Sequence, residues 1–190
     1  MWRADLALIG QARPPTLSAQ ERERAERVLS PGRGEVWARS RWVLRQLLGR
    51  YLGCDPTEVE LEADSAGRLT VTGSREISFS LAHSGSLAVY AFSPRPPVGI
   101  DIEAGAALKE ATVARRLLDP AELGRVSGLA PPERRREVLR AWVRREALLK
   151  CSSAGASDPW LFERDAWPGV ACALAVTCGP CPAVSWWDLS

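Results

Sequence analysis

The sequence has few lysines, one histidine and no long apolar run. Of its 25 basic residues, only Lys109 and Lys150 are lysines, and His83 is the single histidine. Its uninterrupted apolar stretches fall well short of the ~20 residues that a membrane-spanning helix needs. The apolar patch near the N-terminus is also shorter than the core of a secretory signal, and it follows Asp5. We therefore expect a cytoplasmic protein that does not associate with membranes.

The overall charge and the cysteine content exclude further classes of protein. A net charge of only +2 at pH 7 gives no reason to expect a nucleic-acid partner. Five cysteines, an odd number, indicate reduced thiols rather than a disulfide framework. A redox or zinc site formed by Cys178, Cys181 and Cys172 is the alternative. No second cysteine pair and no nearby histidine supports such a site.

What the sequence does contain is a mixed pattern of helical and strand periodicity. Helices are expected over residues 17–30, 35–53, 108–118, 118–126 and 133–150, and strands over 6–10, 59–63, 68–73, 76–84, 86–93, 98–103, 164–167 and 171–178. Because strands and helices do not alternate strictly, the expected fold class is α+β. The prolines at 94–97 predict a boundary between an N-terminal lobe, residues 1–95, and a C-terminal lobe, residues 96–190.

The strand 97-PVGIDIEAG-105 carries two carboxylates in an otherwise apolar run. Asp101 and Glu103 are two residues apart, so a strand places them on one face, about 7 Å apart. Such like charges repel unless a positive group lies between them. Two solvent-facing carboxylates at a strand end are one interpretation. A site for a hard cation such as Mg²⁺, which prefers oxygen ligands, is the other.

The expected long helix offers a third carboxylate and a lysine. In 142-WVRREALLK-150, Glu146 and Lys150 are four residues apart and share one face of the helix. An exposed ion pair on a solvated helix is the ordinary outcome of this spacing. The functional alternative assigns Glu146 to the metal ion and Lys150 to a phosphate group.

The single histidine lies where an apolar strand meets a turn, in 79-FSLAHSG-85. An exposed turn histidine, or a buried one with satisfied hydrogen bonds, is the usual case. A histidine at a strand end, beside Ser84 and Gly85, can also donate a hydrogen bond to a phosphate oxygen.

Taken together, these three segments resemble the motif set of the Sfp-type 4′-phosphopantetheinyl transferases. The family patterns are F-N-x-S-H-S, [VI]-G-[VI]-D-[VI]-E and W-x-x-K-E-A-x-x-K, and this chain has FSLAHSG, VGIDIE and WVRREALLK in the same order. The stretch LRQLLGRYLG and 67-GRL-69, which is similar to a G-[KR]-P motif, also lie at the expected places. The resemblance covers about residues 17 to 150.

The resemblance implies transfer of the 4′-phosphopantetheine arm of coenzyme A to a serine of an apo acyl or peptidyl carrier protein, with Mg²⁺ required. The implied fold is a pseudo-dimer of two similar α+β lobes in one chain, each a small antiparallel sheet with a long helix. The active site of the implied monomer lies at the junction of the lobes. The second lobe is expected to be shortened at its C-terminus, because little of the chain follows Lys150.

The resemblance also implies roles for individual residues. Asp101, Glu103 and Glu146 match the Mg²⁺ ligands, and Glu146 also matches the proposed base that deprotonates the carrier serine. Lys150 matches the lysine at the phosphate under attack. The residues expected to contact coenzyme A are His83, Ser84, Arg68, Lys150, and Arg39 or Arg41, between which the register is open.

This chain departs from the family patterns at several positions. Ala82 replaces the serine before the histidine, Ser80 stands where asparagine is usual, Leu69 replaces a proline, and Arg145 replaces a lysine. These departures leave an alternative function open. The alternative is a relative that binds coenzyme A, a thioester or a carrier protein without transferring the arm.

Overall fold

The computed structural model describes residues 1–9, 16–27, 31–64, 68–74, 76–105, 110–152, 158–178 and 180–189. These residues form, in chain order, β1 (Trp2–Asp5), α1 (Ala19–Arg27), α2 (Pro31–Leu52), β2 (Leu61–Ala63), β3 (Leu69–Val71), β4 (Ile77–Ser84), β5 (Leu87–Pro94), β6 (Val98–Glu103), α3 (Glu110–Leu117), α4 (Pro120–Ser127), α5 (Pro131–Cys151), β7 (Trp160–Trp167), β8 (Val170–Val176) and β9 (Trp187–Leu189). The expected α+β class is confirmed. None of the helices in these ranges combines the length and the hydropathy that a transmembrane span requires.

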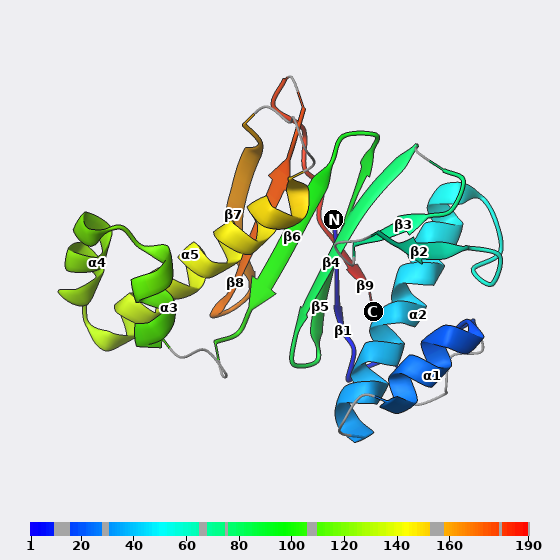
Figure 1. The fold of residues 1–190 in the computed structure, drawn as a ribbon, viewed down its shortest axis with the longest axis horizontal. Coiled ribbons are helices and arrows are strands. Elements are labelled where there is room, and N and C mark those ends of the chain that lie inside the picture. The colour runs from blue at the N-terminus through cyan, green and yellow to red at the C-terminus, as the bar shows by residue number, and fades with distance from the viewer. Residues whose placement is uncertain are drawn as a thin grey trace.

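The first sheet has the strand order β4-β5-β1-β9 and packs one face against the long helix α2 (Figure 1). Leu44 and Leu48 of α2 are fully buried in one apolar cluster with Ala88 and Tyr90 of β5. The helix α1 lies against α2, where Glu21 forms a buried ion pair of 2.8 Å with Arg45. A separate two-stranded sheet, β2-β3, lies beside α2 (Figure 1).

The second sheet has the order β6-β8-β7 and packs against the long helix α5. Val143 and Ala147 of α5 are buried against Ala171 and Ala173 of β8. The approach of helix and sheet is closest at Gly99 of β6. A Cβ atom placed on Gly99 would lie 2.0 Å from the carbonyl oxygen of Ala147 and 2.4 Å from the amide nitrogen of Cys151. Only glycine therefore permits this packing.

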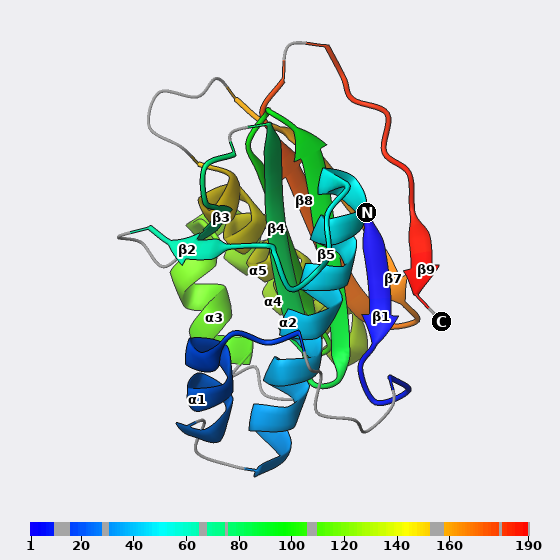
Figure 2. The same cartoon turned by 90° about the vertical axis from the view of Figure 1, so that its right-hand side faces the viewer.

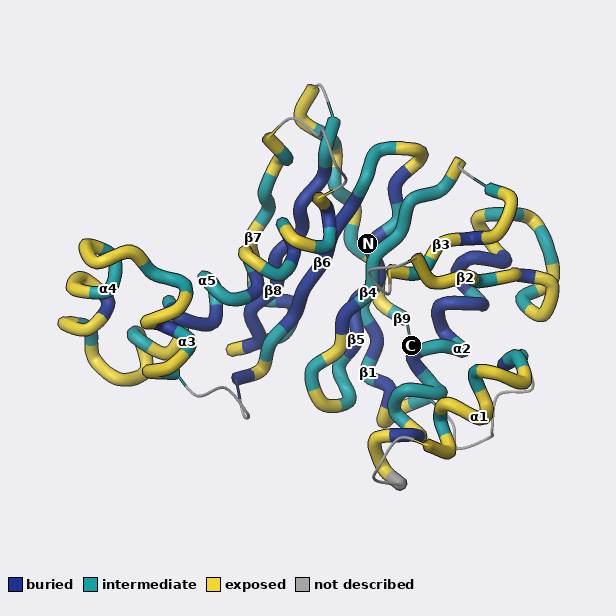
Figure 3. The backbone as a smooth tube through the Cα atoms, viewed as in Figure 1, coloured by how far each residue is buried: buried dark blue, intermediate teal, exposed yellow. Residues whose placement is uncertain are grey.

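The two sheets also pack against each other, which gives the order helix, sheet, sheet, helix (Figures 1 and 2). Val89 and Ala91 of β5 form one buried cluster with Ile100 of β6 and Leu174 of β8. Figure 3 shows the buried backbone concentrated along these inner strands. Burial on both faces explains why 170-VACALAV-176 has no polar alternation, because successive side chains point to two different cores.

Most of the expected elements are present, with shifted ends. The hairpin of β4 and β5 forms, and its turn residue Gly85 has a φ of 60°, a conformation that suits glycine. Ser18 is the cap that begins α1, because it exchanges hydrogen bonds with Glu21. The first two positions of the helix expected over 108–118 lie outside the described residues.

The prediction of a strand at residues 6–10 is wrong. The first strand is β1, which ends at Asp5, where the carboxylate accepts a hydrogen bond from the amide of Ala7 and turns the chain. Leu6 is nevertheless fully buried, which explains the apolar pattern that suggested a strand. The described residues that follow Asp5, residues 6–9, form a turn and a bend rather than a strand.

The strand β9 was not predicted, and it pairs in parallel with β1 at the edge of the first sheet (Figure 2). Trp187 stacks on Trp2 with ring centroids 5.8 Å apart, and Arg164 of β7 lies 4.3 Å from the ring centroid of Trp186. Some of the tryptophans near the C-terminus thus cover a sheet edge, which otherwise exposes unpaired backbone groups. The boundary at residues 95 and 96 stays a prediction, because β9 joins its sheet from the far end of the chain.

Candidate functional site

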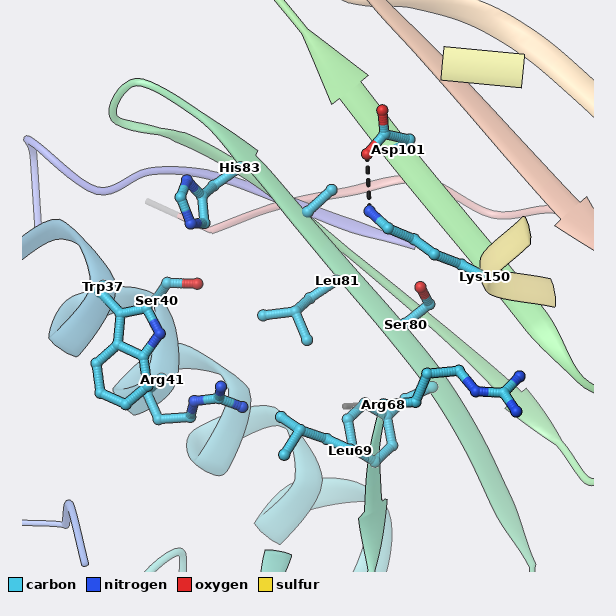
Figure 4. Close-up of a pocket in the computed structure, with 12 residues that line it drawn as sticks. Trp37, Ser40, Arg41, Arg68, Leu69, Ser80, Leu81, His83, Asp101 and Lys150 are labelled. Carbon is cyan, nitrogen blue, oxygen red and sulfur yellow. Dashed lines mark hydrogen bonds and ion pairs between the residues drawn. The ribbon is translucent and has the colours of Figure 1, made fainter. Parts of the chain in front are cut away.

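A pocket of about 380 Å³ lies between the two long helices (Figure 4). Five parts of the chain supply its walls: α2, the residues around the start of β3, and β4, β6 and α5. The described residues that line it are Trp37, Ser40, Arg41, Arg68, Leu69, Phe79, Ser80, Leu81, Ala82, His83, Asp101 and Lys150. Five of the residues expected from the sequence therefore meet here: Arg41, Arg68, His83, Asp101 and Lys150.

The wall from α2 presents Trp37, Ser40 and Arg41, which share one face of the helix because they are three and four residues apart. The guanidinium of Arg41 lies 5.0 Å from the ring centroid of Trp37 and 3.8 Å from a carboxylate oxygen of Glu21. Its Nη1 is buried and has no hydrogen-bond partner among the described residues. A buried donor without a partner costs free energy, so this position favours an anionic ligand.

The choice between Arg39 and Arg41 follows from the same helical geometry. Arg39 is not among the pocket residues, and its guanidinium donates to the carbonyl oxygen of Leu6 at 3.1 Å and to Glu35 at 3.4 Å. Residues two apart on a helix point to different faces, so the structure brings only Arg41 to the pocket. Burial lowers the pKa of Arg41 from its usual value, and the nearby carboxylate of Glu21 opposes this effect.

The opposite wall contains an ion pair between β6 and α5. Lys150 Nζ lies 2.7 Å from Asp101 Oδ1 and also donates to the carbonyl oxygen of Ile100 at 3.1 Å (Figure 4). The close packing of Gly99 on β6 against Ala147, Lys150 and Cys151 of α5 brings these two groups within reach. Asp101 is only 8% exposed. Burial raises the pKa of this carboxyl, the charge of Lys150 opposes the rise, and Glu146 and Glu103 add to it.

Glu103 and Glu146 lie near Asp101 but are not among the residues that line the pocket. Glu103 Oε1 accepts hydrogen bonds from Ser84 Oγ at 2.9 Å and from the amide of Gly105 at 2.7 Å. In the described part of the chain, no three histidine, cysteine, aspartate or glutamate side chains are arranged to hold a metal ion. Glu103 and Glu146 interact with Asp101 only through their negative charges, which raise its pKa.

The donor chemistry of these carboxylates still fits a hard cation. Among the described residues, Asp101 accepts its hydrogen bond from Lys150 through Oδ1, and Glu103 accepts its hydrogen bonds through Oε1. Their second oxygen atoms remain available as ligands. Mutual repulsion, which contributes to the raised pKa of Asp101, is the condition that a bound divalent cation relieves.

Arg68 and His83 stand at the rim of the pocket. Arg68 is bonded to Asp64 at 3.1 Å and donates to the carbonyl oxygen of Ser152 at 2.8 Å. His83 is exposed. Desolvation lowers the pKa of its imidazole, and the positive charges of Lys150 and Arg41 lower the pKa further. An anion bound beside the imidazole would oppose this effect and favour the protonated form.

Some expected features do not belong to the pocket, and two pocket residues were missed. Ser84 is not among the pocket residues, since its hydroxyl is bonded to Glu103. The five cysteines are free thiols, and burial raises the pKa of Cys172 to about 12, so it is a core thiol. Gly67 of the segment 67-GRL-69 lies outside the described residues. Trp37 and Ser40 were missed, although their spacing from Arg41 is a signal that the sequence contains.

Comparisons with known proteins find similarity to one family of enzymes. Residues 97–179, which include β6, α5 and the carboxylates on them, match the family described as the 4′-phosphopantetheinyl transferase superfamily. The 4′-phosphopantetheinyl transferase HetI of Nostoc sp. (strain PCC 7120) is 31% identical over 145 residues, which cover 74% of this chain and 61% of that protein. A protein of Synechocystis sp. (strain PCC 6803), whose name proposes the same activity, is 27% identical over 144 residues, covering 74% of this chain and 58% of that protein.

The chain thus spans 61% and 58% of the length of these two curated relatives. The matched family segment, residues 97–179, begins directly at β6 and includes Asp101, Glu103 and Glu146. On these grounds, the chain is similar to the 4′-phosphopantetheinyl transferases, and the matched part contains β6 and α5.

Proposed function

We propose that this protein transfers the 4′-phosphopantetheine arm of coenzyme A to a serine of an apo acyl or peptidyl carrier protein, and that the reaction requires Mg²⁺. The observation that supports this most is the composition of the pocket. Arg41, His83 and Lys150 supply donors for phosphate groups, and they line one pocket with the buried carboxylate of Asp101 in a chain similar to this superfamily. A phosphoryl transfer needs this combination of positioning and charge compensation.

We further propose that the chain is a monomeric pseudo-dimer of two lobes, residues 1–95 and 96–190, and that it acts in the cytoplasm. In support, each of the two main sheets packs against one long helix (Figure 1). Residues of both lobes line the pocket. The second sheet has only three strands among the described residues, which supports a shortened second lobe.

A Mg²⁺ ion would be held by Asp101, Glu103 and Glu146. When bound, it would supply positive charge to the pyrophosphate of coenzyme A, which lowers the cost of developing negative charge. The protein contributes the ordering of these ligands: Lys150 holds one oxygen atom of Asp101, and Ser84 with the amide of Gly105 holds one oxygen atom of Glu103.

The reaction itself is a displacement at the β-phosphorus of coenzyme A. The oxygen atom of the carrier serine forms a new bond to phosphorus, the bond from phosphorus to 3′,5′-ADP breaks, and the serine proton goes to Glu146. Lys150 would neutralise the phosphate under attack, because its amine reaches into the pocket from α5. Arg41, Arg68 and His83 would bind the phosphate groups of the leaving nucleotide, whereas Arg39 and Ser84 are bonded to groups outside the pocket.

The test of this proposal is a transfer assay on the whole chain. The protein is incubated with Mg²⁺, coenzyme A and an apo carrier protein, and the intact mass of the carrier is measured. We expect one added phosphopantetheine arm and an equal amount of released 3′,5′-ADP. Carrier proteins from fatty acid, polyketide and non-ribosomal peptide synthesis are tested in parallel. No modification of any of them, together with measurable binding of coenzyme A, would favour a binding module over a transferase.

The pKa of His83 predicts a pH dependence of nucleotide binding. Because the pKa of His83 is lowered from 6.5, protonation of the imidazole increases as the pH falls below that value, and a bound phosphate favours the protonated form. We expect the affinity for 3′,5′-ADP, relative to that of His83→Gln, to rise about tenfold between pH 7.5 and pH 5.5. This corresponds to about 1.4 kcal/mol for one charge-assisted hydrogen bond.

The comparison with His83→Gln corrects for protonation of the phosphate itself, which both proteins share. Isothermal titration calorimetry at several pH values measures both affinities. A ratio that stays constant from pH 7.5 to pH 5.5 would show that His83 does not contact a phosphate group.

A further inference from the structure

The junction between the two sheets is held by serine side chains. The strands β4 and β6 lie side by side (Figure 1) but belong to different sheets. Ser80 Oγ on β4 accepts a hydrogen bond of 3.1 Å from the amide of Ile100 on β6. Ser84 Oγ accepts one of 3.1 Å from the amide of Ala104, just after β6. Ser80 and Ser84 are four residues apart on β4, so both hydroxyls point to the same neighbour.

The hydrogen bonds of Ser84 have a defined direction. A backbone amide can only donate, so Ser84 Oγ is the acceptor from Ala104. The single hydrogen atom of the hydroxyl is then available to Glu103 Oε1, which lies 2.9 Å away. A carboxylate accepts but does not donate, so the three groups form one relay from Ala104 through Ser84 to Glu103.

This relay orders the carboxylate of Glu103. Oε1 accepts from both Ser84 and the amide of Gly105. Two donors on one oxygen atom fix the plane and the rotation of the carboxylate, and no hydrogen bond within the described residues engages Oε2. The carboxylate is therefore held with one oxygen atom occupied and the other available.

We propose that Ser84 is a positioning residue: it holds Glu103 in the orientation in which Oε2 binds the divalent cation, rather than contacting coenzyme A itself. This inference rests on the proposed function. Ser84 follows His83 on β4, so the same turn links the residue at the phosphate groups with the carboxylate on β6. Contact with coenzyme A would require the Ser84 hydroxyl to give up its hydrogen bond to Glu103.

The test measures cation binding without turnover. Binding of Mn²⁺ to the whole protein, with coenzyme A present and no carrier protein, is followed by electron paramagnetic resonance. We expect Ser84→Ala and the isosteric Ser84→Cys to bind Mn²⁺ about tenfold more weakly than the wild type, as is typical when a group that orients a metal ligand is lost. Ser84→Thr keeps the hydroxyl and should restore most of the affinity.

The matched control is Ser78→Ala, on the same strand and the same face. The Ser78 hydroxyl makes no hydrogen bond within the described ranges, so the variant should stay within about twofold of the wild type. Thermal unfolding of each variant shows whether it is folded. If Ser84→Ala does not fold, the comparison of Ser84→Cys with Ser84→Thr decides the question.

The outcomes separate this inference from the proposed function. Transfer by the wild type with unchanged Mn²⁺ affinity in Ser84→Ala and Ser84→Cys overturns the role of Ser84 and leaves the function intact. Weakened Mn²⁺ binding in both variants without transfer by the wild type supports the role of Ser84 and overturns the function. No Mn²⁺ binding by the wild type overturns the role of Ser84. In the transfer assay, the expected signature is a tenfold higher Mg²⁺ requirement with kcat nearly unchanged at saturating Mg²⁺.

Discussion

Replacement of Asp101 by asparagine is expected to lower kcat/KM for phosphopantetheine transfer about a thousandfold without lowering the stability of the protein at pH 7. The loss corresponds to about 4 kcal/mol of transition-state stabilisation, because the variant removes a charged ligand of the proposed cation and the partner of Lys150. The protein would thus resemble many enzymes in which a functional charge is kept at a cost in stability.

The expected effect on stability follows from the sign of the pKa shift. Burial raises the pKa of Asp101 above its usual value of 3.8, so the carboxyl holds its proton more tightly in the folded chain than in the unfolded chain. The favourable contribution of the protonated form is complete below pH 3.8 and is lost as the pH rises through the folded pKa. At pH 7 the ionised group therefore destabilises the fold, and Asp101→Asn removes that cost. The advantage of the variant should shrink as the pH falls toward 4.

Asp55→Asn provides a control of opposite sign. Hydrogen bonds from Thr57 lower the pKa of Asp55, so this carboxylate stabilises the fold above pH 3.8 and loses that effect as the pH falls. Chemical denaturation between pH 4 and pH 8 measures both variants. Asp101→Asn would contradict the account if it retained transfer activity, or if it lost activity only because it was unfolded at pH 7.

Replacement of Gly99 by alanine is expected to lower the free energy of unfolding by about 3 kcal/mol. The added Cβ would lie 2.0 Å from the carbonyl oxygen of Ala147 and 2.4 Å from the amide nitrogen of Cys151. Both are backbone atoms of α5, so the helix must move away from β6. Such a movement also separates Lys150 from Asp101, and transfer should fall well beyond what the unfolded fraction explains. Urea denaturation and the transfer assay measure the two effects.

The matched control is Gly124→Ala on the exposed helix α4, where an added Cβ meets no atom within 4 Å. This variant should gain about 0.5–1 kcal/mol of stability, because alanine is the better helix former. A folded Gly99→Ala protein with unchanged stability would mean that α5 does not pack as closely on β6 as the structure shows.

The sequence was most informative where local patterns and tertiary contacts agree. The strand 98–103 and the helix that ends beside Lys150 were predicted within a few residues, because their apolar spacing and their turn residues favour the observed structure. The meeting of His83, Asp101 and Lys150 in one pocket followed from the family resemblance alone. No local rule brings three residues from two strands and a helix together.

Other features depend on contacts that no local pattern contains. The strand β9 has three residues and forms only because β1 offers a free edge. The choice of Arg41 over Arg39 required the rotation of α2, which is set by burial of Leu44 and Leu48. The hydroxyl of Ser84 was expected at coenzyme A because it neighbours His83. The approach of β6 gives this hydroxyl a different partner.

The central claim is that the pocket between α2, β4, β6 and α5 holds coenzyme A for transfer. A crystal structure of the protein with coenzyme A and Mg²⁺ tests it most directly. We predict the pyrophosphate between Lys150 and the carboxylates of β6, with the remaining phosphate near Arg41 and His83. Coenzyme A bound at another surface, with this pocket unchanged, would contradict the account.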